Sequence, residues 1–268
     1  LALIGQIALA DTSVTLEAGV GASDNIGRTE NSEDGAGIYT AGGQFVYDEQ
    51  TQRMTADVRG SVYYMDYTKT SLYDNETLGA LDGSVEFTLK ENMFTWLIQD
   101  NYGQQTVDPF APVRPDNREN VNYFTTGPDL QLLLGNRTAI MLGARFSDVQ
   151  YEIRDLNNQR LGGTLGIERR LNESRALSFN VAADQIDYDD VVNTDFDRQL
   201  AFMRLETEAA RTSLAVDLGW NKVKTDETSA DGLYLALTGS REISSTISLT
   251  GSIGSRYSDA GDSFRFLQ

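Results

Sequence analysis

The sequence has no cysteine and no histidine, and only four of its 268 residues are proline. Without cysteine there is no disulfide framework and no thiolate metal site. Without histidine the Ser-His-Asp and Cys-His arrangements of nucleophilic catalysis are excluded. A carboxylate pair could still serve acid–base chemistry, but no pair stands out among 40 acidic residues. We therefore expect no cofactor, no metal centre and no enzymatic activity.

Positive charge and long apolar runs are also scarce. Lysine and arginine number 22 against 40 aspartates and glutamates, which gives a formal net charge of -18 at pH 7. Because phosphate recognition needs a basic surface, this balance argues against nucleic acid as a partner. No run approaches the roughly 20 apolar residues of a membrane-spanning helix, which excludes helical membrane proteins only. Membrane β-strands spread their apolar residues over alternate positions.

Alternating hydrophobicity dominates what is present. In residues 213–220, Leu214, Val216, Leu218 and Trp220 fall on one face and small or polar residues on the other. A polar loop through residues 224–232 joins this run to a second alternating run at 233–240. Period-two alternation is typical of strands with one apolar face, and two such runs joined by a loop predict an antiparallel hairpin.

The same unit recurs through the chain on about thirteen segments without sustained helical periodicity. A change of phase between Asp184 and Tyr188 is explained by a bulge, or by a strand that extends above a membrane. The predicted strands lie near residues 12–22, 38–47, 55–64, 84–90, 94–98, 123–134, 140–146, 161–167, 177–183, 200–208, 213–221, 233–240 and 247–253, with a further one starting at 264–266.

The linkers alternate between long loops rich in Asp, Asn, Ser and Thr and short polar turns. Predicted strands of about 10 residues match the roughly 9–11 residues that a tilted strand needs to cross a bilayer. Short turns on one side and long loops on the other are the layout of outer-membrane barrels. We predict an all-β, antiparallel up-and-down transmembrane β-barrel in the outer membrane of a Gram-negative bacterium. The competing interpretation is a soluble antiparallel protein.

The two ends of the sequence carry further expectations. Residues 1–10 end in Ala8-Leu9-Ala10, which resembles a small-x-small cleavage site, so we expect them to be the end of a signal peptide. An ordinary first strand or helix is the alternative. Residues 11–268 then form a single barrel domain that is incomplete at its C-terminus. Because bacterial barrels have even strand numbers, we expect about 14–18 strands in the full protein.

The face opposite the apolar one is rich in Ser, Thr, Gly, Asn and Tyr, as expected for the wall of a water-filled lumen. The candidate lumen-lining charged residues are Asp57, Arg59, Glu86, Arg145 and Asp217.

The longest loop, at about residues 106–120, holds three of the four prolines. One interpretation is a loop that folds inward and narrows a pore, with Arg114 and Arg118 as its charged lining. The other is an ordered, exposed cap. Acidic segments at 187–190 and 195–197 lack the spacing of a calcium loop, so we interpret them as solvated loops. Acidic outer loops could share divalent cations with lipopolysaccharide.

Two stretches resemble a known group of proteins. Leu16-Glu-Ala-Gly-Val-Gly-Ala-Ser-Asp-Asn-Ile26 resembles the opening strand, and Pro115-Asp-Asn-Arg-Glu-Asn-Val-Asn-Tyr-Phe-Thr-Thr-Gly-Pro-Asp129 a mid-chain loop-to-strand passage, of the PEP-CTERM/exosortase-associated outer-membrane proteins and related β-barrel porins. The resemblance implies a barrel and a link to exopolysaccharide production or export. It carries no catalytic residues over to this chain.

These expectations combine into two hypotheses. The first is a channel or porin for exopolysaccharide export or passive solute diffusion, with outer-membrane lipid, lipopolysaccharide, exopolysaccharide and its export machinery as partners. The second is a plugged structural or adhesive barrel that acts through its acidic extracellular loops.

Overall fold

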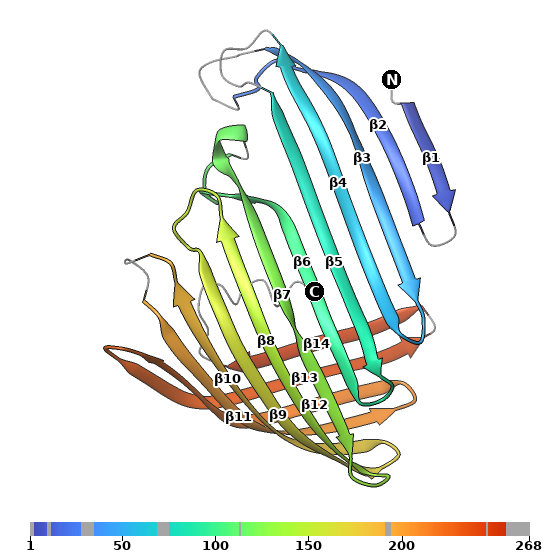
Figure 1. The fold of residues 1–268 in the computed structure, drawn as a ribbon, viewed down its shortest axis with the longest axis vertical. Coiled ribbons are helices and arrows are strands. Elements are labelled where there is room, and N and C mark those ends of the chain that lie inside the picture. The colour runs from blue at the N-terminus through green and yellow to red at the C-terminus, as the bar shows by residue number, and fades with distance from the viewer. Residues whose placement is uncertain are drawn as a thin grey trace. The chain divides into compact units, whose positions relative to one another are not determined.

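A computed structural model describes residues 3–9, 12–27, 35–68, 75–112, 114–190, 194–244 and 246–255, and all strands within these ranges belong to one antiparallel sheet. The strand order in this sheet is the sequence order, so each strand pairs with the strands before and after it (Figure 1). A short 3-10 helix, η1 (Pro115–Asn117), precedes β7. The strands are β1 (Leu3–Leu9), β2 (Thr12–Ser23), β3 (Ala36–Gln50), β4 (Met54–Thr68), β5 (Glu76–Lys90), β6 (Phe94–Thr106), β7 (Arg118–Leu133), β8 (Thr138–Tyr151), β9 (Asn158–Asn172), β10 (Arg175–Tyr188), β11 (Phe196–Ala209), β12 (Thr212–Thr225), β13 (Ser229–Ser244) and β14 (Ile247–Ser255).

The predicted antiparallel, up-and-down, all-β arrangement is confirmed. Strands β2–β14 correspond to the thirteen predicted segments, and the further strand expected at 264–266 lies outside the described residues. In the described part of the chain β1 and β14 stand at the two ends of the strand order. Closure into a barrel is therefore not part of the observed sheet. Over the same residues, no helix is long and apolar enough to cross a membrane.

Residues 3–9, within the segment expected to end a signal peptide, form strand β1. This strand pairs with β2 from Leu3↔Ala18 to Leu9↔Thr12. Cleavage near Asp11 stays a prediction.

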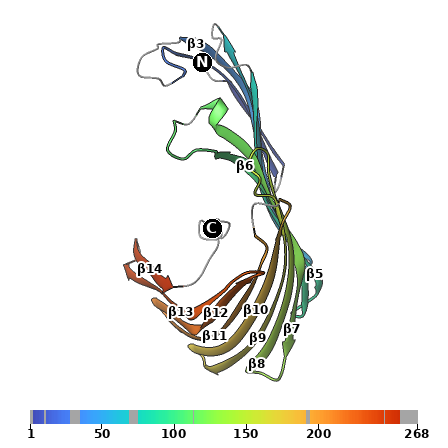
Figure 2. The ribbon, with the colours of Figure 1, turned by 90° about the vertical axis from the view of Figure 1, so that its left-hand side faces the viewer.

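The chain divides into two compact units. Unit 1 comprises residues 1–91, 95–127 and 147–159, and unit 2 comprises residues 92–94, 128–146 and 160–268. Unit 1 therefore holds β1–β5 with most of β6 and the adjoining loop-side parts of β7 and β8. Unit 2 holds β9–β14, except the first residues of β9, and the remaining parts of β7 and β8. Strands within each unit form a single layer (Figure 2).

Tight turns join many of the strands. The turn between β5 and β6 contains Asn92 with φ 55°, and the turn between β7 and β8 contains Gly135 with φ 76°. Both values lie in the left-handed region, where Asn and Gly are the least strained residues.

The loop predicted at 224–232 is shorter in the structure. Pairing between β12 and β13 continues out to Lys224↔Ser229. The backbone N–H of Thr225 donates to the Thr228 carbonyl at 2.8 Å, and the Thr228 N–H donates to the Thr225 hydroxyl at 3.0 Å. These bonds close a tight turn, so polar residues that resemble a loop in sequence extend two strands instead.

The prediction that a bulge explains the change of phase between Asp184 and Tyr188 is wrong. Pairing between β10 and β11 runs without a shift through Asp184↔Arg198 and Ile186↔Phe196. The strand simply continues, and Ile186 falls on the face opposite Val181, where it is 1% exposed. A register shift lies between β13 and β14, at Glu242 and Ser244.

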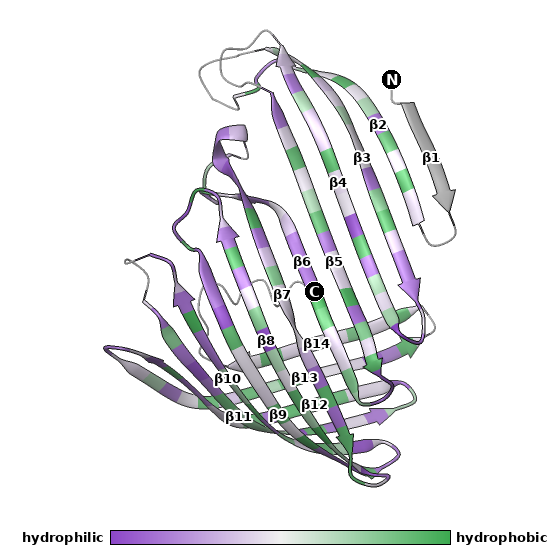
Figure 3. Cartoon of the chain, viewed as in Figure 1, coloured by the Kyte–Doolittle hydropathy of each residue, from purple (hydrophilic) through white to green (hydrophobic). Residues whose placement is uncertain are grey.

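In each unit, apolar residues of neighbouring strands gather on one face, because paired residues of neighbouring antiparallel strands point to the same side. Figure 3 shows the resulting alternation along the strands. In unit 1 this face carries rows such as Leu16↔Gly43↔Val62↔Gly79 and Val14↔Phe45↔Gly60↔Leu81. In unit 2 it carries rows such as Phe179↔Met203↔Leu218↔Leu235 and Leu177↔Leu205↔Val216↔Leu237.

The apolar faces are exposed rather than covered by protein. Leu16 is 59% exposed and Val20 66% in unit 1, and Leu218 is 55% exposed in unit 2. Buried hydrophobic residues within the described ranges are few and mostly small, such as Ala56 and Ala139. The described residues therefore form a sheet with side chains on two faces and without a conventional hydrophobic core.

Close strand contacts use glycine against aromatic rings. In unit 2, Gly219 pairs with Phe202 of β11 on one side and with Tyr234 of β13 on the other. The two rings meet edge to face with centroids 5.4 Å apart. A Cβ added at Gly219 would overlap the Ala201 carbonyl oxygen and the backbone of Phe202. Only glycine leaves room for this approach.

We predict that Gly219→Ala destabilises the sheet by about 1–3 kcal/mol, because the added methyl group forces backbone and ring to move apart. The measurement is the urea unfolding midpoint of the folded protein. Gly251→Ala is the matched control, since a Cβ there meets nothing within 4 Å. Equal midpoints for both variants would contradict the packing argument.

Candidate functional site: the polar face

The face opposite the apolar one, called here the polar face, carries the charged residues singled out from the sequence. In unit 1 the register Asp57↔Ser84, Arg59↔Asp82 and Thr55↔Glu86 places Asp57, Arg59 and Glu86 on this one face. In unit 2 Asp217 pairs with Arg204, on the side opposite Leu218. That these residues line a lumen stays a prediction.

Arg59 forms ion pairs within its own strand, β4, and with the preceding strand, β3. Its Nη2 lies 2.9 Å from Asp57 Oδ2 and 3.8 Å from Asp48 Oδ1. All three side chains are about half exposed, so this cluster contributes at most about 1 kcal/mol to stability.

A second group on the unit 1 polar face joins an amide, a phenol and a carboxylate. Gln44 Nε2 donates to the Tyr63 hydroxyl, and the Tyr63 hydroxyl donates to Glu17 Oε2 at 3.3 Å. The Tyr63 ring lies over Gly42, its partner on β3. A ring and planar polar groups therefore lie side by side here.

Asp217 is the most strongly held carboxylate on the unit 2 polar face. Arg204 donates from Nε to Oδ1 at 2.7 Å and from Nη2 to Oδ2 at 2.8 Å, a bidentate pair. The Tyr234 hydroxyl adds a third bond to Oδ2 at 3.3 Å, and Asp217 is 3% exposed. Asp217, one of the candidate lumen-lining residues, therefore links β11, β12 and β13 through its hydrogen bonds.

Two further arginine–aspartate pairs cross strands in unit 2. Arg198 Nη2 lies 3.0 Å from Asp184 Oδ2. Arg145, predicted to line a lumen, forms an ion pair with Asp129 and also donates to the Pro128 carbonyl at 3.0 Å. Each of these arginines therefore has its charge compensated by a neighbouring strand.

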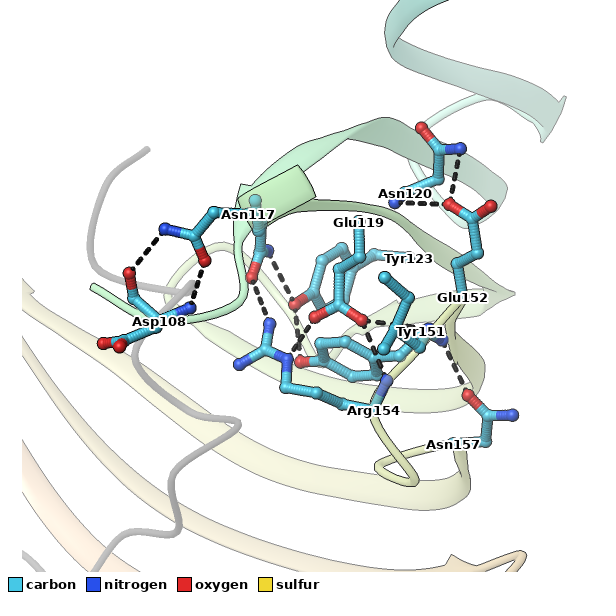
Figure 4. A network of polar contacts seen from close by, with 11 residues as sticks. Asp108, Asn117, Glu119, Asn120, Tyr123, Tyr151, Glu152, Arg154 and Asn157 are labelled. Atoms are coloured by element: carbon cyan, nitrogen blue, oxygen red, sulfur yellow. Dashed lines mark hydrogen bonds and ion pairs between the residues drawn. The ribbon is translucent and has the colours of Figure 1, made fainter. Parts of the chain in front are cut away.

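At the long-loop ends of β6–β9, unit 1 contains a buried polar network (Figure 4). The Glu119 side chain is 0% exposed. Its Oε2 accepts from the backbone N–H of Arg154 at 2.9 Å and of Ile153 at 3.1 Å, while Oε1 receives the Arg154 guanidinium Nε. The carboxylate thus binds the β8–β9 loop to the start of β7.

Arg154 extends this network to aromatic residues. Its guanidinium carbon lies 4.9 Å from the Tyr151 ring centroid, and its Nη2 donates to Gln105 Oε1 at 3.2 Å. The Tyr151 and Tyr123 hydroxyls are 2.9 Å apart, and Gln105 Nε2 donates to the Tyr123 hydroxyl at 3.2 Å. One guanidinium therefore connects β6, β7 and β8.

The proline-bearing loop is organised around Asn117. Its amide Oδ1 accepts from the Asp108 N–H at 2.8 Å, and its Nδ2 donates to the carbonyls of Asp108 at 3.0 Å and Pro112 at 3.1 Å. Asn117 is 6% exposed, whereas Phe110 in the same loop is 97% exposed. The loop is an ordered element rather than a plain hairpin connection.

Both arginines predicted to line a constriction have partners in the structure. Arg118 Nη2 lies 2.9 Å from Glu76 Oε1, and Arg114 Nε lies 3.2 Å from Asp116 Oδ1. Glu76 also accepts a hydrogen bond from the Tyr67 hydroxyl. The placement of Arg114 and Arg118 in a narrowed pore stays a prediction.

Sequence reasoning missed Glu119, Arg154 and Asn117. Nothing in their spacing separates them from other polar residues near loops, because their contacts arise only when loops fold back on the strands. In the part of the chain that the structure describes, no three Asp or Glu side chains gather in a way that could hold a metal ion. No protein-family model matches the chain, and no curated protein matches it.

We predict that Glu119→Ala destabilises unit 1 by about 3 kcal/mol, because it leaves the Arg154 guanidinium and two backbone N–H groups without their acceptor. Urea unfolding measures the loss, and limited proteolysis detects the released β8–β9 loop. Glu91→Ala, in an exposed turn, is the control. A Glu119→Ala protein with unchanged midpoint and cleavage would show that the network does not hold the loop.

Proposed function

We propose that this chain forms the wall of an outer-membrane β-barrel, with the apolar face towards lipid and the polar face lining a channel for hydrated, neutral or weakly charged solutes, exopolysaccharide among them. One observation carries the proposal. An exposed apolar face is paired residue by residue across β2–β5 and across β10–β13, opposite a face that carries ion pairs, and no protein layer covers it within the described residues. A soluble protein rarely leaves so large a contiguous apolar surface in water.

Strand length supports lipid as the material that covers this face. Strands β2–β13 span 12 to 16 residues. Because roughly 9–11 residues suffice to cross the hydrocarbon core, each strand has residues left to project beyond it. Since unpaired backbone groups are not tolerated in lipid, the proposal requires closure of the sheet into a barrel.

The polar face supports passage of uncharged rather than strongly charged solutes. Arg59, Arg145, Arg198 and Arg204 each have an aspartate partner within the sheet. Paired charges leave a weaker field than a wall of one sign, while their polar atoms still offer hydrogen bonds to a hydrated solute. The resemblance of residues 16–26 and 115–129 to exopolysaccharide-linked barrels points to the same class of solute.

A second candidate is a structural or adhesive barrel with a blocked lumen. The loop between β6 and β7 is fixed by Asn117, and the loop between β8 and β9 by Glu119. Such rigid loops suit a permanent cap or a surface that partners recognise. Lipopolysaccharide, through shared divalent cations, is the partner that this candidate favours.

The membrane assignment predicts opposite outcomes for adjacent residues. Leu237, 41% exposed on the apolar face, lies near the middle of β13, and Thr238 points to the polar face. Leu237→Arg should lose about 2–4 kcal/mol of folding free energy in lipid vesicles, whereas Thr238→Arg should lose little. Equal effects of the two substitutions in vesicles would contradict a lipid-facing apolar surface.

The channel assignment is tested with the full-length protein in planar lipid bilayers. We expect stable single-channel current steps with weak preference between small anions and cations, because the wall charges are paired. A heat-resistant folded protein that inserts but passes no current would reject the channel and favour the blocked barrel. Gel mobility of unheated samples confirms that the protein tested is folded.

A further inference from the structure

The polar face of unit 2 contains two adjoining hollows. The larger, about 1080 Å³, lies where the short turns after β9 and β7 approach each other, with Arg137 and Ser174 in its lining. The smaller, about 230 Å³, lies further along the strands and is lined by Asn180, Phe202 and Arg204. Glu206 lines both hollows, so together they form one track along the polar face.

This track is balanced in charge although the whole chain is acidic. Among the described residues that line it are four arginines and four glutamates. A strongly anionic ligand such as nucleic acid gains nothing from such a surface. A lipid chain is disfavoured too, because most of the lining is polar.

Phe202 is the feature that points to a ligand class. Its ring lies on the polar face, against Gly219 on β12 and beside Tyr234 on β13, and it lines the smaller hollow. The Arg204 guanidinium carbon lies 5.6 Å from the ring centroid. Amide, hydroxyl and carboxylate groups of Asn180, Ser178 and Glu206 border the same hollow. An aromatic face surrounded by planar hydrogen-bonding groups suits a ligand with both C–H faces and hydroxyl edges.

We propose that this track binds a segment of neutral carbohydrate chain, with a sugar ring stacked on Phe202 and its hydroxyl groups bonded to Asn180, Ser178 and Glu206. The proposal rests on the proposed function and gives its channel wall a solute class. The Arg204–Asp217 pair keeps the guanidinium next to the ring fixed, so the site is formed before ligand arrives. The larger hollow gives room for further units of the chain.

The same combination occurs on the polar face of unit 1. There Tyr63 lies over Gly42 with Gln44 and Glu17 bonded at its hydroxyl. A ring over glycine beside planar polar groups thus appears on both units independently, as expected if a carbohydrate chain contacts the wall at more than one place.

The test uses the full-length protein, folded in detergent, and isothermal titration calorimetry with two neutral glucose hexamers, cellohexaose and maltohexaose. We expect at least one hexamer to bind at millimolar or lower concentration, and Phe202→Leu to weaken that binding about tenfold. Phe202→Tyr keeps a ring over Gly219 and should bind like the wild type. Phe179→Leu, the same change on the apolar face of β10, should have no effect.

Two results would overturn the proposal: no heat from either hexamer with folded wild-type protein, or equal affinity of wild type and Phe202→Leu. The unfolding midpoints of the variants show whether weaker binding comes from a lost ligand contact or from a lost packing contact with Gly219. Binding in detergent needs only the folded sheet, not an open pore. A conducting protein that binds no sugar therefore rejects this inference alone, and a sugar-binding protein without conductance rejects the channel alone.

Discussion

The sheet is one layer deep, and this constraint shapes everything else in the molecule. Backbone N–H and C=O groups are satisfied by neighbouring strands, yet the apolar side chains of those strands contact no second layer of described protein. Burial of apolar surface contributes about 25 cal/mol per Å² only where a partner removes it from water. A fold built this way depends on a surrounding medium, so the identity of that medium is the central functional question.

Register makes the two faces mutually dependent. If β12 slipped by one residue against β11, Asp217 would move to the apolar face and Leu218 to the polar one. The bidentate bonds between Arg204 and Asp217 and the fit of Phe202 over Gly219 both oppose that slip. Polar pairs and glycine–aromatic contacts thus specify the strand alignment that a hydrophobic core specifies in soluble domains.

Sequence patterns predicted the antiparallel, up-and-down, all-β arrangement and its polar face, but not the individual side-chain contacts. Strand positions followed from the alternation of apolar and polar residues. The pairing of Arg204 with Asp217 could be counted out from the sequence, because both residues lie equally far from the tight turn at 210–211. Asp184 and Arg198 are separated by a long loop, so their register could not be counted out from a turn. The contacts of Glu119 depend on how the β8–β9 loop folds against the start of β7, and no sequence periodicity encodes that. The prediction of a bulge at 184–188 was wrong, because the alternation of apolar and polar residues describes the side chains and does not show where backbone pairing is interrupted.

The buried carboxylate of Glu119 bears on how the proposed channel would select its solute. Burying an ion pair gains little net stability over an apolar pair, so its main consequence is a single arrangement of the groups it joins. Two backbone amides and one guanidinium converge on Glu119, which holds the β8–β9 loop in one position. A loop held in this way does not serve as a freely moving gate. Selection in such a channel would then reside in fixed wall groups, where paired charges and aromatic rings act on the solute throughout its passage.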